Sequence, residues 1–336
     1  MLASGAATIA GVAAAPPAQL CRTRRGGARS SSRRRSAPVV THAAGTPTPA
    51  STELRRLLAA PGIHLGPCAH DGLSARLIER AGFSFMFMSG FCVSATRLGA
   101  PDAGLISYGE MVSEGSLICQ ATRLPVIGDG DTGYGNAMNC KRTVRGYAHA
   151  GFAGILIEDQ VHPKQCGHMR TRSVVSRAEA VARVRAACDA RDASADIVIV
   201  ARSDARSAVD LDEALWRAAA FADAGADAVF VDALRSEADM RALCKAVPAA
   251  VPKMANMLEG GQTPICTPAA LQDMGFKIVA YPLSLLGVSM RAMESALVSL
   301  RTGTIPGAEA LPSFAHMQEV IGFNAYYDEE ARYRTD

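Results

Sequence analysis

The sequence lacks the patterns that define several large classes of protein. No apolar run approaches the roughly 20 residues that a membrane-spanning helix needs, so we expect a soluble protein without a membrane partner. No GxGxxG or Walker-type glycine loop opens a helical stretch, which argues against a nucleotide-binding sheet. Aromatic residues are only 5% of the chain and hydrophobic residues 49%, so we expect an aliphatic, helix-rich core.

The nine cysteines are odd in number and form no CxxC pair. A chain of 336 residues can bury a core large enough to fold without disulfides. We therefore expect reduced thiols, most of them serving as small core residues.

Acidic residues are absent from the first 44 residues, which contain seven Arg among many Ala, Ser and Pro. This composition predicts a disordered organellar transit peptide over 1–44 and favours the chloroplast stroma, with the mitochondrion as alternative. A basic arm that binds nucleic acid is the other interpretation. Without those seven, residues 45–336 contain 28 basic and 32 acidic residues. This slightly negative net charge argues against a nucleic-acid partner.

From residue 51 onward, short apolar runs alternate with helical stretches. The predicted strands cover 64–69, 85–89, 126–128, 154–158, 197–201, 228–232, 253–257 and 278–283. The predicted helices between and after them cover 72–81, 108–122, 139–150, 176–191, 211–224, 237–247, 268–274 and 286–301, and Ser51 or Thr52 would cap a first short helix. Eight such units over about 250 residues predict a (β/α)8 TIM barrel for 51–302, with an open doubly wound sheet as alternative.

Residues 303–336 fall outside the eight units and predict a C-terminal helical extension. We expect an amphipathic helix over 313–321, followed by a polar tail with three tyrosines. A segment of this kind packs on a neighbouring subunit or on the bottom of the barrel.

Polar or small residues end seven of the eight predicted strands, where the loops of a barrel build its active site. They are Ser89, Gly90, Asp129, Asp131, Glu158, Asp159, Arg202, Asp204, Asp232, Asn256, Glu259 and Ser284. Any one of them can be a helix cap or a solvated turn, but the set indicates a site.

Three of these acids suggest a metal site. Asp129 and Asp131 are two apart and can share a strand face, and Glu158 ends the next strand. Oxygen ligands without a nearby second His or Cys favour Mg²⁺ or Mn²⁺ over zinc. We expect contact largely through metal-bound waters. The alternative is a structural ion network balanced by Arg202.

The segment 160–175 has no periodicity, as is typical of a lid, and contains Lys164, Cys166 and His168. Positive charge nearby would lower the pKa of the Cys166 thiol and suit it to proton transfer. The alternative is a surface cysteine in a basic loop. Asp102, in GAPDAG, reads in isolation as a turn residue.

These motifs carry a resemblance to a known family. The ordered set SGF, LGAPDAG, DGDTGYGN, IEDQVHPKQCGH, VARSDAR, ANMLEGGQTP and YPLS resembles the isocitrate lyase/phosphoenolpyruvate mutase superfamily over roughly residues 55–300. It is most similar to the plant and bacterial branch that includes carboxyvinyl-carboxyphosphonate phosphorylmutases, the petal death protein and methylisocitrate or dimethylmalate lyases. The resemblance implies a Mg²⁺-dependent TIM barrel that forms a homotetramer by swapping its eighth helix.

The resemblance also implies roles for individual residues. Asp129, Asp131 and Glu158 would be metal-site acids, and Cys166 the proton donor of a lid that also contributes Lys164 and His168. Arg202 would act on a substrate carboxylate. The residues implied in substrate binding are Ser89, Gly90, Phe91, Asp102, Gly167, Asp232 and Asn256.

Three departures from the branch's pattern bear on the substrate. Gln165 stands in place of Lys or Arg, Phe91 in place of Tyr, and Asp232 in place of Glu. Each removes a charge, a hydroxyl or a methylene from the site, which can change substrate discrimination by orders of magnitude.

The expected activity is cleavage of a 2-hydroxy di- or tricarboxylate of the 2-alkylmalate, isocitrate or methylisocitrate type, giving a 2-oxo acid and a carboxylate. Phosphonomutase chemistry is the second hypothesis, and Cys166 argues against it because the mutases carry an Asn-containing lid without this Cys. Oxaloacetate hydrolysis and a non-catalytic barrel are the remaining alternatives.

Overall fold

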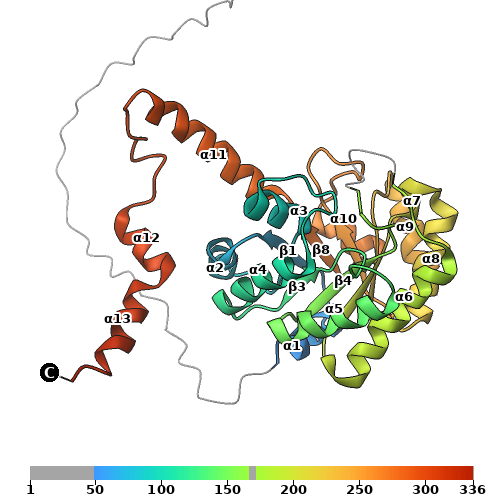
Figure 1. Cartoon of the computed structure of the whole chain (residues 1–336). Coiled ribbons are helices and arrows are strands. Elements are labelled where there is room, and N and C mark those ends of the chain that lie inside the picture. The colour runs from blue at the N-terminus through green and yellow to red at the C-terminus, as the bar shows by residue number, and fades with distance from the viewer. Residues whose placement is uncertain (1–48, 166–171, 336) are drawn as a thin grey trace, which may run out of the picture. The chain divides into compact units, whose positions relative to one another are not determined.

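The computed structural model describes residues 49–165 and 172–335, and its centre is a closed barrel of eight parallel strands (Figure 1). The strands are β1 His64–Ala69, β2 Met86–Met88, β3 Val126–Asp129, β4 Gly154–Glu158, β5 Val198–Ser203, β6 Ala228–Val231, β7 Lys253–Asn256 and β8 Ile278–Tyr281. Each pairs with the next in the sequence, and β8 closes on β1. The predicted (β/α)8 fold is confirmed.

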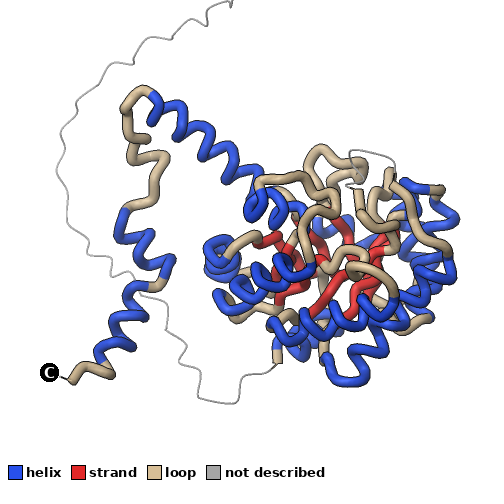
Figure 2. The backbone as a smooth tube through the Cα atoms, in the orientation of Figure 1, coloured by secondary structure: helices blue, strands red, loops and turns tan. Residues whose placement is uncertain are grey.

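Helices surround the strands, as Figure 2 shows in blue around red. Those following the eight strands are α2 Gly72–Arg80, α4 Tyr108–Ala121, α5 Ala137–Ala150, α6 Arg177–Ala190, α8 Leu211–Asp223, α9 Glu237–Ala246, α10 Pro268–Met274 and α11 Ser284–Arg301. The others are α1 Ala50–Ala59, α3 Gly90–Val93, α7 Ala205–Ala208, α12 Phe314–Ile321, α13 Phe323–Ala331 and the π-helical turns η1 Ser94–Leu98 and η2 Arg191–Ala195. No helix in the described ranges combines the length and apolarity needed to cross a membrane.

The core has two layers. Outward-facing strand residues pack against the surrounding helices, whereas inward-facing residues such as Leu156, Val200 and Phe230 fill the barrel. Leu54 and Leu57 of α1 belong to the inner cluster and are buried. Helix α1 therefore covers the end of the barrel away from the strand carboxyl ends, which leaves those carboxyl ends to form a cavity.

The structure differs in detail from the sequence expectations at two places. Helix α1 has no side-chain cap, because its N-cap residue is Pro49, and Ser51 lies inside the helix, where its hydroxyl donates to Asp196 Oδ2 at 2.9 Å. The expected polar tail contains a helix, α13, which starts where Gly322 ends α12 in a left-handed conformation (φ 94°). The predicted transit peptide lies outside the described residues.

Candidate active site

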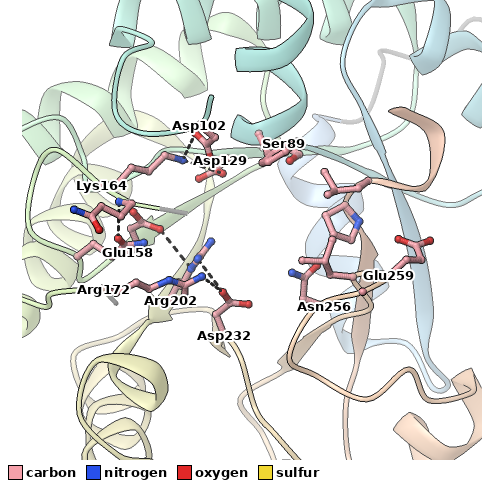
Figure 3. A pocket seen from close by; sticks show the side chains of 18 residues that line it. Ser89, Asp102, Asp129, Glu158, Lys164, Arg172, Arg202, Asp232, Asn256 and Glu259 are labelled. Carbon is pink, nitrogen blue, oxygen red and sulfur yellow. Dashed lines mark hydrogen bonds and ion pairs between the residues drawn. The ribbon is translucent and has the colours of Figure 1, made fainter. Parts of the chain in front are cut away.

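A cavity of about 290 Å³ opens at the carboxyl ends of the strands (Figure 3). Its lining residues are Ser89, Phe91, Asp102, Asp129, Glu158, Gln160, Lys164, Gln165, Arg172, Arg202, Asp232, Asn256, Leu258, Glu259, Gly260, Gly261, Pro282 and Leu283. These residues come from the carboxyl-terminal ends of strands β3, β4, β5 and β7 and from the loops after β2, β4, β6, β7 and β8, as expected for a TIM barrel.

Asp129, the last residue of β3, is held from several directions. Its Oδ2 accepts from Gly90 N at 3.1 Å and its Oδ1 from Asp131 N at 3.1 Å, while the Tyr147 hydroxyl donates to its backbone oxygen at 2.7 Å. The strand ends at Asp129, and Asp131 lies beyond it with a left-handed φ of 48°. The expectation that both acids share a strand face was therefore wrong. A turn brings them together.

Lys164 lies among Asp102, Asp129 and Asp131, which we call the acid cluster. Its Nζ is 3.0 Å from Asp102 Oδ1 and 3.9 Å from Asp129 Oδ2, and it also pairs with Asp131. Burial alone would lower the pKa of Lys164, but these carboxylates outweigh it and hold the pKa well above its ordinary value. The effect of nearby positive charge on the Cys166 thiol stays a prediction, because Cys166 lies outside the described residues. Among the described residues, the Lys164 charge is paired with the carboxylates.

The acids respond differently to burial. Burial raises the pKa of Asp131 to about 7 and that of Glu158 well above its ordinary value. Burial would also raise the pKa of Asp129, but Lys164 and Arg202 overcome this and keep it low. The site thus combines a buried carboxylate that stays ionised with two that protonate more readily.

Glu158 carries a further signal. Both of its carboxylate oxygens are buried with no hydrogen-bond partner among the described residues, and Arg202 Nε lies 3.4 Å from one of them. Unsatisfied buried oxygens are costly and call for an explanation. Within 49–165 and 172–335, no three His, Cys, Asp or Glu side chains form a ready-made metal site. The donor set therefore fits a hydrated Mg²⁺ held largely through waters better than direct binding by three carboxylates.

Two arginines and two aspartates form a second charged group, next to Glu158. We name Arg172, Arg202, Asp204 and Asp232 the Arg–Asp network. Arg202 Nη2 donates to Asp204 Oδ1 at 2.8 Å and to Asp232 Oδ2 at 3.1 Å. Arg172 Nη2 pairs with the same Asp232 oxygen at 2.6 Å, and its Nη1 donates to the same Asp204 oxygen. The two guanidinium groups are therefore held by shared carboxylates.

The other wall is less charged. Phe91, Leu258, Pro282 and Leu283 contribute apolar surface. Figure 3 places Asn256 and Glu259 on this side, across the cavity from Lys164 and the arginines. The cavity therefore offers cations and acids on one side and a mainly apolar face on the other.

Most of the predicted site residues meet here. Those that line the cavity are Ser89, Phe91, Asp102, Asp129, Glu158, Lys164, Arg202, Asp232 and Asn256. Gly90 and Asp131 contact them from behind the cavity surface. Cys166, Gly167 and His168 lie outside the described residues. Sequence reasoning missed Arg172 and Gln160, which follow no strand pattern, and the apolar residues Leu258, Pro282 and Leu283.

A TIM barrel with buried carboxylates, a lysine and two arginines around one cavity has the layout of an enzyme for small anionic substrates. The family model described as phosphoenolpyruvate phosphomutase matches residues 54–301. The chain belongs to the PEP mutase/isocitrate lyase superfamily.

Its relatives catalyse several reactions. It is 39% identical over 287 residues to 2,3-dimethylmalate lyase of Eubacterium barkeri, covering 85% of this chain and 98% of that protein. It is 38% identical to the chloroplastic carboxyvinyl-carboxyphosphonate phosphorylmutase of Arabidopsis thaliana, covering 84% of each.

A solved structure of oxaloacetate acetylhydrolase with 3,3-difluorooxalacetate matches with a TM-score of 0.80 and 32% identity, covering 85% of this chain and 98% of that one. A phosphonopyruvate hydrolase complex with oxalate and Mg²⁺ matches with a TM-score of 0.76 and 30% identity, covering 85% and 99%. The relatives thus act on small acids by lyase, mutase or hydrolase chemistry.

Proposed function

We propose that this protein is a Mg²⁺-dependent carbon–carbon lyase. Its substrate is a 2-hydroxy di- or tricarboxylate of the 2-alkylmalate, isocitrate or methylisocitrate type, and its products are a 2-oxo acid and a second carboxylate. The observation that carries the proposal is the pair of unsatisfied Glu158 oxygens between Asp129 and Arg202 in a cavity of small-molecule size. The similarity to 2,3-dimethylmalate lyase supports it.

Asp129, Asp131 and Glu158 would hold Mg²⁺, largely through its waters. When bound, the ion supplies positive charge to the substrate's 2-hydroxyl, its adjacent carboxylate and the oxo group that replaces the hydroxyl. Mn²⁺ is an alternative ion. Lys164 neutralises the acid cluster in the described structure, so ion binding and the position of Lys164 are coupled.

The chain's own residues then account for the proton balance. The 2-hydroxyl gives up its proton to the Glu158 carboxylate, whose buried oxygens face the cavity without a hydrogen-bond partner among the described residues. The C2–C3 bond breaks, and its electron pair moves onto the departing carboxylate fragment. Arg202 binds a carboxylate and stabilises the developing negative charge. Cys166 gives its S–H proton to the carbon of that fragment, with Lys164, Gly167 and His168 on the same lid. Ser89, Gly90, Phe91, Asp102 and Asn256 orient the substrate, whereas Asp232, also implied in binding by the resemblance, pairs with Arg202 and so acts on the substrate only through that arginine.

The role of Cys166 is tested by Cys166→Ser. A hydroxyl is a far weaker acid than a thiol, so we expect kcat to fall by roughly 10²- to 10⁴-fold, the usual contribution of general acid catalysis. Oxalate binding in the presence of Mg²⁺ should stay within a few-fold of wild type. Cys140→Ser, at a buried thiol in α5, is the control. Full turnover by Cys166→Ser would contradict the assignment.

Oxaloacetate hydrolysis is a second candidate, favoured by the structural match to oxaloacetate acetylhydrolase. Phosphonomutase chemistry is the third, suggested by the family description and by the Arabidopsis relative. Release of oxalate from oxaloacetate would establish the second, and a phosphonate product in phosphorus NMR the third. Failure to bind Mg²⁺ and oxalate would favour a non-catalytic barrel.

We also propose a helix-swapped homotetramer that resides in the chloroplast stroma, with the mitochondrion as the alternative compartment. Exposed apolar side chains along α11 support the assembly. The composition of residues 1–44 supports the chloroplast location. A fusion of residues 1–48 to a fluorescent protein tests this location. Fluorescence that stays in the cytosol would contradict it.

A further inference from the structure

Arg172 has no role in the proposed mechanism, yet it is among the most deeply buried charges of the cavity wall. Its side chain is 2% exposed, and it lines the cavity together with Arg202 and Asp232. Its Nε is buried with no hydrogen-bond partner among the described residues. Burying a guanidinium costs free energy that close pairing with carboxylates must offset, so the contribution of Arg172 has to be sought in its ionic partners.

The backbone on one side of Arg172 is paired with residues 159–161, which directly follow strand β4. Gln160 and Val174 form an isolated antiparallel bridge, Val161 N donates to Ser173 O at 2.9 Å, and Val175 N donates to Asp159 O at 2.9 Å. This pairing places Arg172 two residues before the bridge, close to the end of β4. Its guanidinium is thereby directed at the Arg–Asp network.

The charges of the network explain what Arg172 contributes. Arg202 faces three carboxylates, those of Glu158, Asp204 and Asp232, and a single positive charge cannot balance them while also attracting a substrate carboxylate. Asp204 and Asp232 are almost fully buried, at 0% and 3% side-chain exposure, so water screens them poorly. Arg172 pairs with both.

We propose that Arg172 is a positioning residue that neutralises Asp204 and Asp232 and so leaves the charge of Arg202 available to a dianionic, carboxylate-bearing ligand. Arg172 acts through the two aspartates, because its own Nη atoms are occupied by them and its Nε is sealed from the cavity. The proposal rests on the proposed function in one respect only, that the cavity receives a carboxylate.

The position of Asp232 fits this role. Its carboxylate lies near the end of β6, where Arg172 Nη2 reaches it at 2.6 Å and Arg202 Nη2 at 3.1 Å. Arg172 and Asp232 therefore form a matched pair. The two residues should be replaceable together more readily than Arg172 alone.

The test measures oxalate binding to the full-length protein by calorimetry in the presence of Mg²⁺. Arg172→Met removes one positive charge from Asp204 and Asp232 and leaves Arg202 more strongly engaged by them, so we expect oxalate affinity to fall on the order of 10- to 100-fold, as for one unit charge at intermediate dielectric. Arg172→Lys keeps the charge and should lose only a few-fold. Arg172→Met/Asp232→Asn removes one charge of each sign and should recover most of the affinity.

Two further variants complete the test, a control and a variant that should raise the affinity for oxalate. Arg206→Met removes another arginine–aspartate pair, outside the cavity lining, and should leave oxalate binding unchanged. Asp232→Asn alone leaves Arg172 and Arg202 in excess and should tighten oxalate binding several-fold. It gives a readout even if Arg172→Met fails to fold.

Wild-type affinity in Arg172→Met, no recovery in the double variant, or weaker binding by Asp232→Asn would overturn the proposal. So would a wild-type protein that does not bind oxalate. Because the assay needs no turnover, it separates this proposal from the lyase assignment. Loss of oxalate affinity with no malate or isocitrate cleavage would retain Arg172 and reject the lyase. Malate or isocitrate cleavage by the wild type, together with normal oxalate binding by Arg172→Met, would support the lyase and reject the role of Arg172.

Discussion

Gly90 shows how little space the acid cluster leaves around Lys164. A Cβ at this residue would lie 2.8 Å from Asp129 Oδ2 and 3.0 Å from Lys164 Nζ, closer than side-chain atoms tolerate. Its backbone N–H also donates to Asp129. The glycine is thus required by a close approach between α3 and the carboxylate at the end of β3.

Gly90→Ala should displace the Asp129 carboxylate and the Lys164 amine without creating a cavity in the hydrophobic core. We expect activity to fall roughly 100-fold, the effect of a misplacement of about 1 Å in an active site, with only a small change in melting temperature. Gly72→Ala is the matched control, since its Cβ would meet Ala121 at an ordinary 3.4 Å. Activity close to wild type in Gly90→Ala would show that the cluster adjusts freely.

For single residues, the sequence predicted the identity of the site residues better than the geometry of their contacts. The acids and Arg202 at strand ends were found because a parallel barrel brings all its strand carboxyl ends to one edge. The left-handed turn at Asp131 and the direction of Lys164 depend on tertiary contacts that no periodicity records. Arg172 was missed because its position depends on the pairing of Val174 with Gln160, across a loop without a repeat.

The loops after the strands are tied to one another by buried or partly buried ion pairs. Asp239, at the start of α9, accepts from Arg206 of α7 at 2.7 Å and from the backbone of Arg235 at 3.1 Å. Burial would raise the pKa of Asp239, but these hydrogen bonds and that from Ser236 outweigh it and lower the pKa. The ionised carboxylate therefore joins the loops after β5 and β6.

Asp239→Asn should destabilise the protein by about 1 kcal/mol at pH 7, because it removes charge-assisted hydrogen bonds. A carboxyl whose pKa is lowered by folding stabilises the protein above its unfolded pKa of about 3.9, and that contribution disappears as the pH falls through the folded value. The difference from wild type should therefore shrink below about pH 4 in denaturant titrations.

Asp273→Asn is the control for this element. Asp273 is 74% exposed and pairs with Arg241 only at 3.4 Å, so its substitution should have little effect at either pH. A pH-independent loss in Asp239→Asn would contradict the ionic origin of the contact.

Whole elements were predicted more accurately than their ends. Strand β4 and helix α10 have the predicted limits, since apolar runs and glycine stops define them in the sequence. The short elements α3, α7, η1 and η2 were missed, because segments of four or five residues carry no measurable period. Of these, α3, η1 and α7 follow β2 or β5 and belong to the loops that build the site, whereas η2 lies between α6 and β5.

On the scale of the molecule, α11 differs from the other barrel helices. Leu286 is its buried residue, whereas Val288, Met293, Leu297 and Val298 are between 57% and 72% exposed. A row of exposed apolar side chains of this extent marks an interaction surface. It supports the proposed assembly through α11.

Met293→Glu/Leu297→Glu places two charges one helical turn apart on this surface. We expect the assembly to dissociate toward monomers in light scattering coupled to size exclusion, while circular dichroism retains the barrel signal. Arg291→Glu, which adds a negative charge at an exposed polar position of the same helix, should leave the mass unchanged. An undisturbed tetramer in the double variant would show that α11 is not the contact.

The most direct test of the lyase assignment is turnover of defined acids by the purified protein, with Mg²⁺ and after chelation. Isocitrate, 2-methylisocitrate, 2,3-dimethylmalate and oxaloacetate would be supplied in turn, with detection of 2-oxo acids and oxalate. We expect Mg²⁺-dependent release of a 2-oxo acid from at least one of the first three. No 2-oxo acid from any of them, or equal turnover without the metal, would contradict the account.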